Sequence, residues 1–276
     1  MTRRPAVAGT WYPGSAGALT REVDAYLAAV PEVPGGSVTA IIAPHAGLMF
    51  SGPVGAHAYK AVAGGQYEVA VLVGPSHFVA FDGVALYPEG SFEFPLGSAA
   101  IDRVGAEAIS AAPIVSSRPS AHSREHSLEM QLPFLKYVLP DVPIVPLLMG
   151  YQHRETITAL ADALASAFDR RRTLLVASTD LSHYFDAATA VSLDARVQEA
   201  VRAFDPDALL ELFESYPEHE RGKYVACGGG PAISVLLAAR ALGAREARVL
   251  KYGHSGEISG DYDGVVGYMA AAVGTF

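Results

Sequence analysis

The sequence is poor in cysteine and contains no long hydrophobic run. Cys227 is the single cysteine among 276 residues, which excludes an internal disulfide and favours a reducing compartment. The first residues are not followed by the apolar segment of a secretory signal. No stretch approaches the roughly 20 apolar residues that a helix needs to span a bilayer. We therefore expect a cytoplasmic protein without a membrane partner.

Positive charge is also scarce. Lysine and arginine total 20 residues against 29 aspartates and glutamates, so the formal net charge is −9 at pH 7. Nucleic acids and anionic membranes both bind basic surfaces. The basic run at residues 170–172 precedes an expected strand and is typical of a solvated loop. The charge balance therefore argues against a nucleic-acid partner.

Apolar runs and helical periodicities alternate along the chain. Apolar runs predict strands at 38–43, 69–73, 83–87, 142–149, 173–177, 247–252 and 265–273. Helical spacing predicts helices at 15–30, 53–63, 102–112, 123–137, 155–168, 192–204, 206–213 and 231–242. Residues 89–97 are expected to form a turn-rich loop. This alternation is typical of an α/β fold, and we expect one domain over residues 1–276 because no linker or repeat interrupts it.

Three of the expected strands lead to a histidine. The run at 38–43 is followed by Pro44 and His45. The run at 69–73 is followed by His77, and the run at 173–177 by His183. In open α/β sheets, ligands bind outside the carboxyl ends of the strands. We therefore expect the three histidines to contribute to one site.

His45, His77 and Cys227 form the first candidate group, a site for one metal ion. Imidazole binds Zn, Fe, Cu and Ni, and thiolate favours the softer of these ions. Cys227 stands just before an expected helix, where oriented N–H groups lower the thiol pKa. Three protein ligands leave a further position open, as in catalytic metal sites. The alternatives are a small buried cysteine beside hydrogen-bonded histidines, or nucleophilic catalysis by Cys227 with a histidine as base.

Asp180 and His183, in the segment S-T-D-L-S-H, form the second candidate group. A carboxylate beside an imidazole fixes its tautomer and raises its basicity, which makes a general base. The alternative is an aspartate that caps neighbouring backbone. The glycines at 228–230 add a further option, an anion bound at a helix N-terminus.

Residues 122–126, H-S-R-E-H, match the H-x-x-E-H pattern of one metallopeptidase class. On a helix, His122 and His126 would share a face, with Glu125 as base. The helix is expected to begin near residue 123, however, so His122 would precede it. We therefore favour the alternative that His126 and Glu129 line or support the pocket.

Longer motifs follow one another along nearly the whole chain. They are R-x-P-A-V-A-G-T-W-Y-P near the start, A-P-H-A-G with a later S-G-P, G-P-S-H, E-H-S-L-E-x-Q-L-P-F-L, S-T-D-L-S-H, C-G-G-G-P, S-G-x-x-S-G-D and V-V-G-Y. In these motifs and in their order the chain resembles the MEMO family, whose bacterial members are often called AmmeMemoRadiSam system protein B.

The resemblance implies a fold like that of the class III extradiol dioxygenases of the LigB type. That fold is a three-layer α/β sandwich with a central, mostly parallel or mixed sheet and a pocket at one sheet edge. Those enzymes hold Fe(II) with two histidines and one carboxylate, and a further histidine acts as base. The matching positions imply His45, His77 and Cys227 as metal ligands, His183 as the base-like histidine and Asp180 as its neighbour.

The resemblance also implies residues that contact a substrate. Trp11 matches the pocket-wall tryptophan of the family. Without the resemblance, a tryptophan at this position could equally be a core residue. His126 is expected to line the same pocket. Phe50 stands where the family commonly has tyrosine, so a hydroxyl that could hold substrate is missing from this position.

The implied cofactor is one transition-metal ion, with Fe(II) expected and Cu or Zn as alternatives. Sulfur donates more charge than a carboxylate, which favours Cu or Zn and argues against ring cleavage. Two functions follow. The first is a metal-dependent, dioxygenase-like oxidoreductase that acts on a small molecule. The second is a non-catalytic module that uses a vestigial pocket to bind metal, an anion or a peptide. The family name further implies a functional link to a radical-SAM enzyme.

Overall fold

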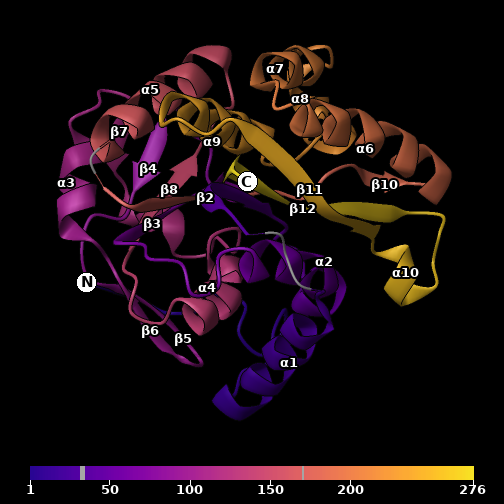
Figure 1. Cartoon of the computed structure of the whole chain (residues 1–276), viewed down its shortest axis with the longest axis horizontal. Coiled ribbons are helices and arrows are strands. Elements are labelled where there is room, and N and C mark those ends of the chain that lie inside the picture. Colours follow the sequence, from indigo (N-terminus) through magenta and orange to yellow (C-terminus); the bar gives the residue numbers. More distant parts are fainter. Residues whose placement is uncertain (32–34, 170) are drawn as a thin grey trace.

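A computed structural model describes residues 1–31, 35–169 and 171–276 of the chain. Its central sheet contains nine strands in this described part: β2 Ser37–Ala43, β3 Val69–Pro75, β4 Val84–Leu86, β7 Val115–Ser117, β8 Ile144–Met149, β9 Thr173–Ser178, β10 His183–Phe185, β11 Glu246–His254 and β12 Val265–Thr275. They run in the order β10-β12-β2-β9-β3-β8-β4-β7, and β11 pairs with β12 (Figure 1). The inner strands β2, β9, β3 and β8 are parallel, whereas β12 joins β2, and β4 joins β8, in antiparallel orientation.

Helices cover both faces of this sheet. They are α1 Ala16–Ala29, α2 Leu48–Lys60, α3 Arg103–Ser110, α4 Leu132–Val138, α5 Arg154–Phe168, α6 Ala187–Arg202, α7 Pro206–Glu214, α8 Glu218–Tyr224, α9 Gly229–Ala241 and α10 Gly256–Ser259. In Figure 1, α5 and α9 lie on one side of the sheet, and α1, α2 and α4 lie on the other. The chain is therefore a three-layer α/β sandwich with a mixed central sheet, as predicted.

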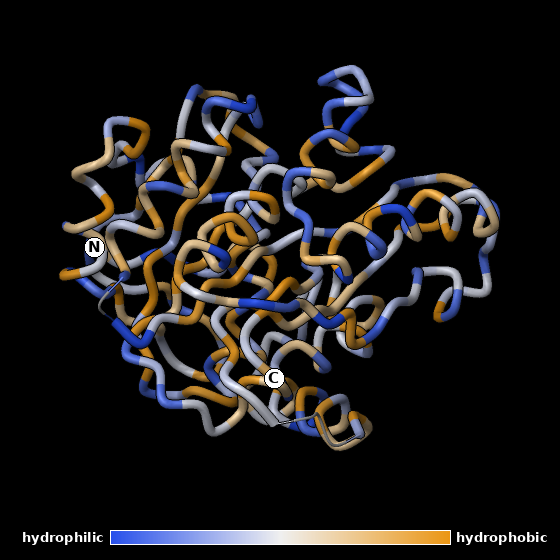
Figure 2. Tube along the Cα trace, turned by 45° about the horizontal axis from the view of Figure 1, so that its top comes forward, coloured by the Kyte–Doolittle hydropathy of each residue, from blue (hydrophilic) through white to orange (hydrophobic). Residues whose placement is uncertain are grey.

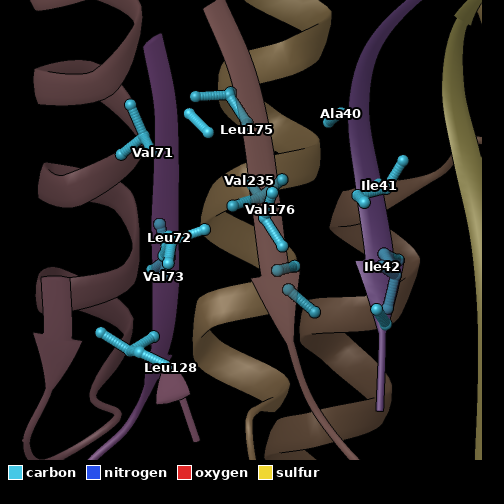
Figure 3. Close-up of a cluster of buried hydrophobic side chains, with 14 of the residues drawn as sticks. Ala40, Ile41, Ile42, Val71, Leu72, Val73, Leu128, Leu175, Val176 and Val235 are labelled. Atoms are coloured by element: carbon cyan, nitrogen blue, oxygen red, sulfur yellow. The ribbon is translucent and has the colours of Figure 1, made fainter. Parts of the chain in front are cut away.

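The inner strands are buried on both faces because helices cover them above and below. Figure 3 shows Ile41 and Ile42 of β2 beside Leu175 and Val176 of β9, with Val235 of α9 packed against the strands. α9 is apolar all round, as expected for a helix that lies between a sheet and another helix. Figure 2 shows the same division, with hydrophobic segments in the interior and hydrophilic segments along outer loops and helices.

The prediction of a turn-rich loop at 89–97 is wrong. Residues Ser91–Phe94 (β5) and Gly97–Ala100 (β6) form a hairpin, and β5 pairs in parallel with the N-terminal strand β1, Thr2–Arg3. Phe92 and Phe94 are buried while Glu93 is exposed, which is the alternation of a strand with one buried face. This small sheet holds the beginning of the chain against the domain.

The expected helix at 123–137 is also wrong. The chain forms two 3-10 turns, Pro119–His122 and Glu129–Gln131, separated by an irregular segment, and only Leu132–Val138 is α-helical. The carboxylate of Glu125 accepts hydrogen bonds from the backbone N–H groups of His126 and Ser127, which competes with helix formation. Pro133 lies in the first turn of α4 and is not a kink.

Other boundaries differ from those expected. α2 begins at Leu48 and contains Pro53, so the helix starts next to His45 and not eight residues later. α6 begins at Ala187, where Asp186 caps its first turn. The short helices α8 and α10 lie in segments for which no helix is expected. Gly47, directly before α2, and Gly222 and Lys223 of α8 line a cavity at the strand ends.

Of the basic run at 170–172, Arg170 lies outside the described residues. Arg171 is ion-paired with Asp102, and Arg172 with Glu68, so these two cations are not a free basic patch.

Within the described ranges, no single helix is long and apolar enough to cross a membrane. Taken together, α8 and α9 are long and apolar enough for such a span, but the two helices meet at a bend of 79°.

Candidate metal centre

A cavity of about 510 Å³ opens at the carboxyl ends of β2 and β3, next to the segment that follows β9. Its lining comes from segments far apart in the sequence: Trp11, His45, Ala46, Gly47, His77, His126, Asp180, His183, Tyr184, Gly222, Lys223, Cys227 and Val266. The structure thus brings His45, His77 and His183 together with Cys227, Asp180, Trp11 and His126. Phe50 is not among the lining residues; it is partly buried on α2 and packs against the core.

His45 follows the last residues of β2, where Pro44 ends the strand. Its Nδ1 atom lies 2.9 Å from the hydroxyl of Ser178. That hydroxyl already donates its hydrogen to the carbonyl of Ser127, at 2.7 Å. His45 must therefore carry a proton on Nδ1 and donate it to Ser178, so Nε2 is the ring nitrogen that faces Cys227 and the cavity.

Gln131 supports this arrangement from beneath. Its Nε2 group donates to Ser178, at 2.7 Å, and to the carbonyl of Pro44, at 3.1 Å. Its Oε1 atom accepts from the hydroxyl of Tyr59, at 2.7 Å, which fixes the orientation of the amide. A buried chain of hydrogen bonds therefore runs from Tyr59 through Gln131 and Ser178 to His45.

His77 is oriented by Glu125. The carboxylate accepts from the Nδ1 of His77, at 2.9 Å, and from its backbone N–H, at 2.5 Å. Burial alone would lower the pKa of His77, but the hydrogen bonds and charges of Cys227 and Glu125 raise it to about 10. Burial would raise the pKa of Glu125, and His77 together with backbone N–H groups lowers it to about 2. In the absence of a metal the pair is therefore an imidazolium and a carboxylate.

Cys227 stands in the turn that leads into α9. Its Sγ atom lies 3.2 Å from His45 Nε2 and accepts the backbone N–H of Asp180 at 3.4 Å. Burial raises the pKa of the thiol, but the charge and hydrogen bond of His45, with a hydrogen bond from His77, lower it to about 6. The sulfur is therefore a thiolate at neutral pH, the form that binds metals.

The three glycines after Cys227 serve the packing of this turn. A side chain at Gly228 would meet the carbonyl of Ser178 at 2.4 Å, and one at Gly229 would meet the Phe213 ring at 2.3 Å. The N–H groups of Gly228, Gly229 and Gly230 donate to Thr179 Oγ1, to the Ala226 carbonyl and to Gln152 Oε1. None of the three is left for an anion, so the anion-binding alternative is wrong.

Gln152 is a support of Cys227 that sequence reasoning missed. Its Nε2 group donates to the Cys227 carbonyl at 2.7 Å, and its Oε1 atom accepts from the Gly230 N–H at 2.7 Å. The side chain thus ties both ends of the turn to the segment after β8. Because Gln152 lies 75 residues from Cys227, no local pattern indicates this contact.

Asp180 and His183 lie in the same cavity but have separate hydrogen-bond partners. The Asp180 carboxylate accepts from the backbone N–H groups of His45 and Ala46, at 2.8 and 3.3 Å. The Nδ1 of His183 donates to the Leu181 carbonyl at 2.7 Å. Asp180 thus caps backbone N–H groups, as in the alternative to a general base. The backbone that it caps is the turn after β2 and not its own segment. His183 keeps the lone pair of Nε2, which is what a base requires.

Burial raises the pKa of Asp180, whereas His183 and the two backbone N–H groups act in the opposite direction. Burial has the larger effect, so the pKa of Asp180 lies above its ordinary value.

Residues 122–126 do not form the helical metal site that the H-x-x-E-H pattern would require. His122 is buried away from the cavity, where its Nε2 lies 3.1 Å from the Ala85 carbonyl and its ring contacts Tyr87 and Phe92. Glu125 is occupied by His77. His122 and His126 do not share a helix, so the spacing on which the peptidase alternative depends is lost.

Trp11 and His126 form one wall of the cavity. Their ring centroids lie 4.3 Å apart, and Trp11 stays 38 % exposed at the rim. Tyr184, in the left-handed backbone region at φ 62°, and Lys223 of α8 complete the rim. Glu129 does not line the cavity but accepts from Arg3, from Tyr12 and from the N–H of Ala6, and so holds the segment that carries Trp11.

Two sets of donor atoms in the described residues lie close enough to hold a metal ion. The first is His45, His77 and His126, and the second is His45, Asp180 and Cys227. Within each set, every donor atom lies within 4.8 Å of the others. The predicted triad of His45, His77 and Cys227 takes members from both. Imidazoles held through Nδ1 and a thiolate are suitable donors for Fe, Cu or Zn once His77 has lost a proton.

Comparisons with known proteins agree with the sequence motifs. A family model described as Memo-like protein matches residues 3–272. A MEMO1 family protein of Methanopyrus kandleri is 37% identical over 98% of each chain. One from Methanothermobacter thermautotrophicus is 37% identical over 97% of this chain and 99% of its own, and one from Thermotoga petrophila is 35% identical over 98% and 99%.

A solved structure also resembles the fold. It is that of an uncharacterized protein from Escherichia coli K12, which superimposes with a TM-score of 0.60 over 86% of this chain and 100% of its own. The sequence identity of 16% means that this likeness concerns the fold alone.

Proposed function

The chain belongs to the Memo-like protein family, and we propose that it is an oxidoreductase that holds one transition-metal ion in the cavity at the strand ends and acts on a small molecule. His45, His77 and Cys227 would hold the ion. Fe(II) is the expected metal, with Cu or Zn as alternatives. A bound redox-active ion would supply electrons to a substrate or to O₂ and polarise whatever binds beside it.

One observation carries this proposal. His45 and His77 both use Nδ1 to donate to fixed acceptors, Ser178 and Glu125, and both therefore keep Nε2 for the cavity. Histidines that bind metals in proteins are oriented in this way by a second hydrogen bond. Two merely structural histidines would not both need to be held through Nδ1 beside a thiolate, so this shared orientation favours a metal centre.

The remaining residues would handle the substrate. His183 is held through Nδ1 by a backbone carbonyl, so its Nε2 can take a proton from a substrate hydroxyl. Trp11 and His126 form an aromatic wall against which a flat substrate could pack. Asp180 keeps the turn after β2 in place through two backbone N–H groups, and so positions His45.

A second candidate function is a non-catalytic module that binds an anionic or peptide ligand. Lys223 favours it, because it is the one lysine or arginine among the described residues that line the cavity. Tyr184, another lining residue, is 71 % exposed and offers a flat surface to a ligand. The cytoplasmic location and the link to a radical-SAM enzyme stay predictions.

Metal analysis and oxygen consumption test the proposal together. Protein purified without chelator should contain about one transition-metal ion per chain, and His77→Ala should lose most of it. His153→Ala, a change at a half-exposed histidine outside the cavity, is the matched control. Consumption of O₂ with a panel of catechols and other small phenols should require His183. Stoichiometric metal without any such consumption would favour the binding module, and absence of metal would overturn the metal centre.

A further inference from the structure

His126 is placed beside the predicted ligands but has no part in the metal triad. Its ring centroid lies 4.7 Å from that of His77 and 5.6 Å from that of His45, and the His45 and His77 centroids are 5.2 Å apart. The side chain is only 10% exposed, so the ring is held in place by its surroundings. The three imidazoles thus form a compact triangle at the base of the cavity.

Glu125 lies close to the Nδ1 atoms of two of these rings. One of its carboxylate oxygens, Oε1, lies 2.9 Å from the Nδ1 of His77 and 3.5 Å from the Nδ1 of His126. The planes of the two rings differ by only 15°. With both Nδ1 atoms close to one oxygen, the nitrogen that each ring has left for a metal ion is Nε2.

The triangle has the dimensions of a three-histidine metal site. With metal–nitrogen distances of about 2.0–2.1 Å and tetrahedral angles, the centroids of bound imidazoles lie about 5 Å apart. The three distances here, 4.7, 5.2 and 5.6 Å, bracket that value. One donor atom from each of the three histidines lies within 4.8 Å of the other two.

Cys227 and His126 approach the shared ligand, His45, from different segments. Cys227 enters from the start of α9, whereas His126 enters from the segment before α4, and these two helices cover opposite faces of the sheet (Figure 1). His45 belongs to both donor sets. Because its free Nε2 can bind only one ion, the two sets cannot be filled at once.

We infer that His126 is an alternative third ligand: an ion held by His45 and His77 is completed either by the Cys227 thiolate or by the His126 imidazole. Soft ions take the sulfur, and ions that prefer nitrogen take the three-imidazole set. This inference rests on the proposed metal centre and adds to it a choice of ligand that depends on the metal.

Titration of the whole protein with Co(II) tests this choice, because thiolate ligation gives Co(II) a strong charge-transfer band that nitrogen ligation lacks. The wild-type protein should bind Co(II) with that band. Cys227→Ser should lose the band but keep tetrahedral Co(II) absorption, with an affinity within about 100-fold of the wild type. His126→Gln should keep the band. The double variant should bind at least about tenfold more weakly than Cys227→Ser.

Electron paramagnetic resonance of Cu(II) in Cys227→Ser gives a second readout. The spectrum should show coupling to three nitrogens, and to fewer when His126→Gln is added. Thermal unfolding of all variants checks that each is folded, and His153→Ala serves as the control histidine. Equal Co(II) affinity in Cys227→Ser and the double variant would overturn the inference while leaving the metal centre intact. Absence of Co(II) binding in the wild type would overturn both.

Discussion

The Nε2 atom of His45 lies 3.2 Å from the Sγ atom of Cys227, although 182 residues separate them in the chain. Each is held independently, His45 by the hydroxyl of Ser178 and Cys227 by the turn that Gln152 ties together. At this distance an imidazole nitrogen and a sulfur can share either a proton or a metal ion. The proton or ion that they share therefore sets the charge of both groups.

Cys227 of the metal-free protein should titrate near pH 6. Burial opposes ionisation, but His45 and His77 lower the thiol pKa to about 6, so the group is a thiol below that pH and a thiolate above it. The rate of alkylation by iodoacetamide should therefore rise through pH 6 and level off near neutrality. His45→Ala removes the largest favourable contribution and should move the midpoint upward. A wild-type midpoint near 9, the ordinary value, would contradict the described environment.

Metal binding should release a proton from His77. The pKa of this ring is raised to about 10, so it is protonated at pH 8 and must lose about one proton to bind an ion. Calorimetric titration with Zn(II) in two buffers of different ionisation enthalpy measures this release. Glu125→Gln removes one of the groups that raise the His77 pKa and should reduce the number of protons released. Equal heats in both buffers for the wild type would show that His77 is not a ligand.

Ser178→Ala should weaken metal binding without unfolding the protein. The substitution removes the acceptor of the His45 Nδ1 proton, and loss of such a contact weakens metal affinity about 10–100-fold. Nitrogen chemical shifts of the ring should show the altered tautomer. Ser234→Ala is the matched control, because Ser234 is also buried and bonds a backbone carbonyl but lies on α9 outside the cavity. Equal losses of affinity in both variants would point to a general effect on the fold.

Arg3→Met should destabilise the fold strongly. Arg3 forms a buried ion pair with Glu129 at 2.5 Å and also donates to the carbonyls of His122 and Glu125. Removing one partner leaves a buried charge unpaired, which costs about 3–5 kcal/mol of unfolding free energy. Chemical denaturation measures it.

Arg240→Met provides the comparison for Arg3→Met, because its ion pair with Asp207 is exposed and should contribute about 1 kcal/mol or less. Combining Arg3→Met with Glu129→Gln should recover part of the loss, because both charges are then gone while an amide oxygen can still accept from Tyr12 and from the N–H of Val7. A loss for Arg3→Met no larger than that for Arg240→Met would mean that the Arg3 pair is not buried in solution.

The sequence predicts the inner sheet well because its signals there are local. A strand buried on both faces needs a continuous apolar run, and such runs occur at β2, β3 and β9. It predicts the segments around the site less well. In residues 123–128 a side chain, that of Glu125, takes hydrogen bonds from the backbone, and helical spacing cannot reveal this.

The motif E-H-S-L-E-x-Q does contain the missed supports, Glu125 and Gln131. Their types alone do not say which groups they bond. Gln131 contacts Tyr59, 72 residues away, and Ser178, 47 residues away. Sequence motifs therefore indicate which residues matter near the cavity but not what each of them contacts.

The sequence by itself determined that the chain is an α/β protein and that His45, His77 and His183 stand where inner strands end, because apolar runs and the residues that stop them are adjacent in the chain. Only the tertiary structure decided which ring nitrogen each histidine turns to the cavity and how close His126 lies to His45 and His77. The physical reason is that each tautomer follows from a hydrogen-bond acceptor supplied across the fold, by Ser178 from 133 residues away for His45 and by Glu125 from 48 residues away for His77.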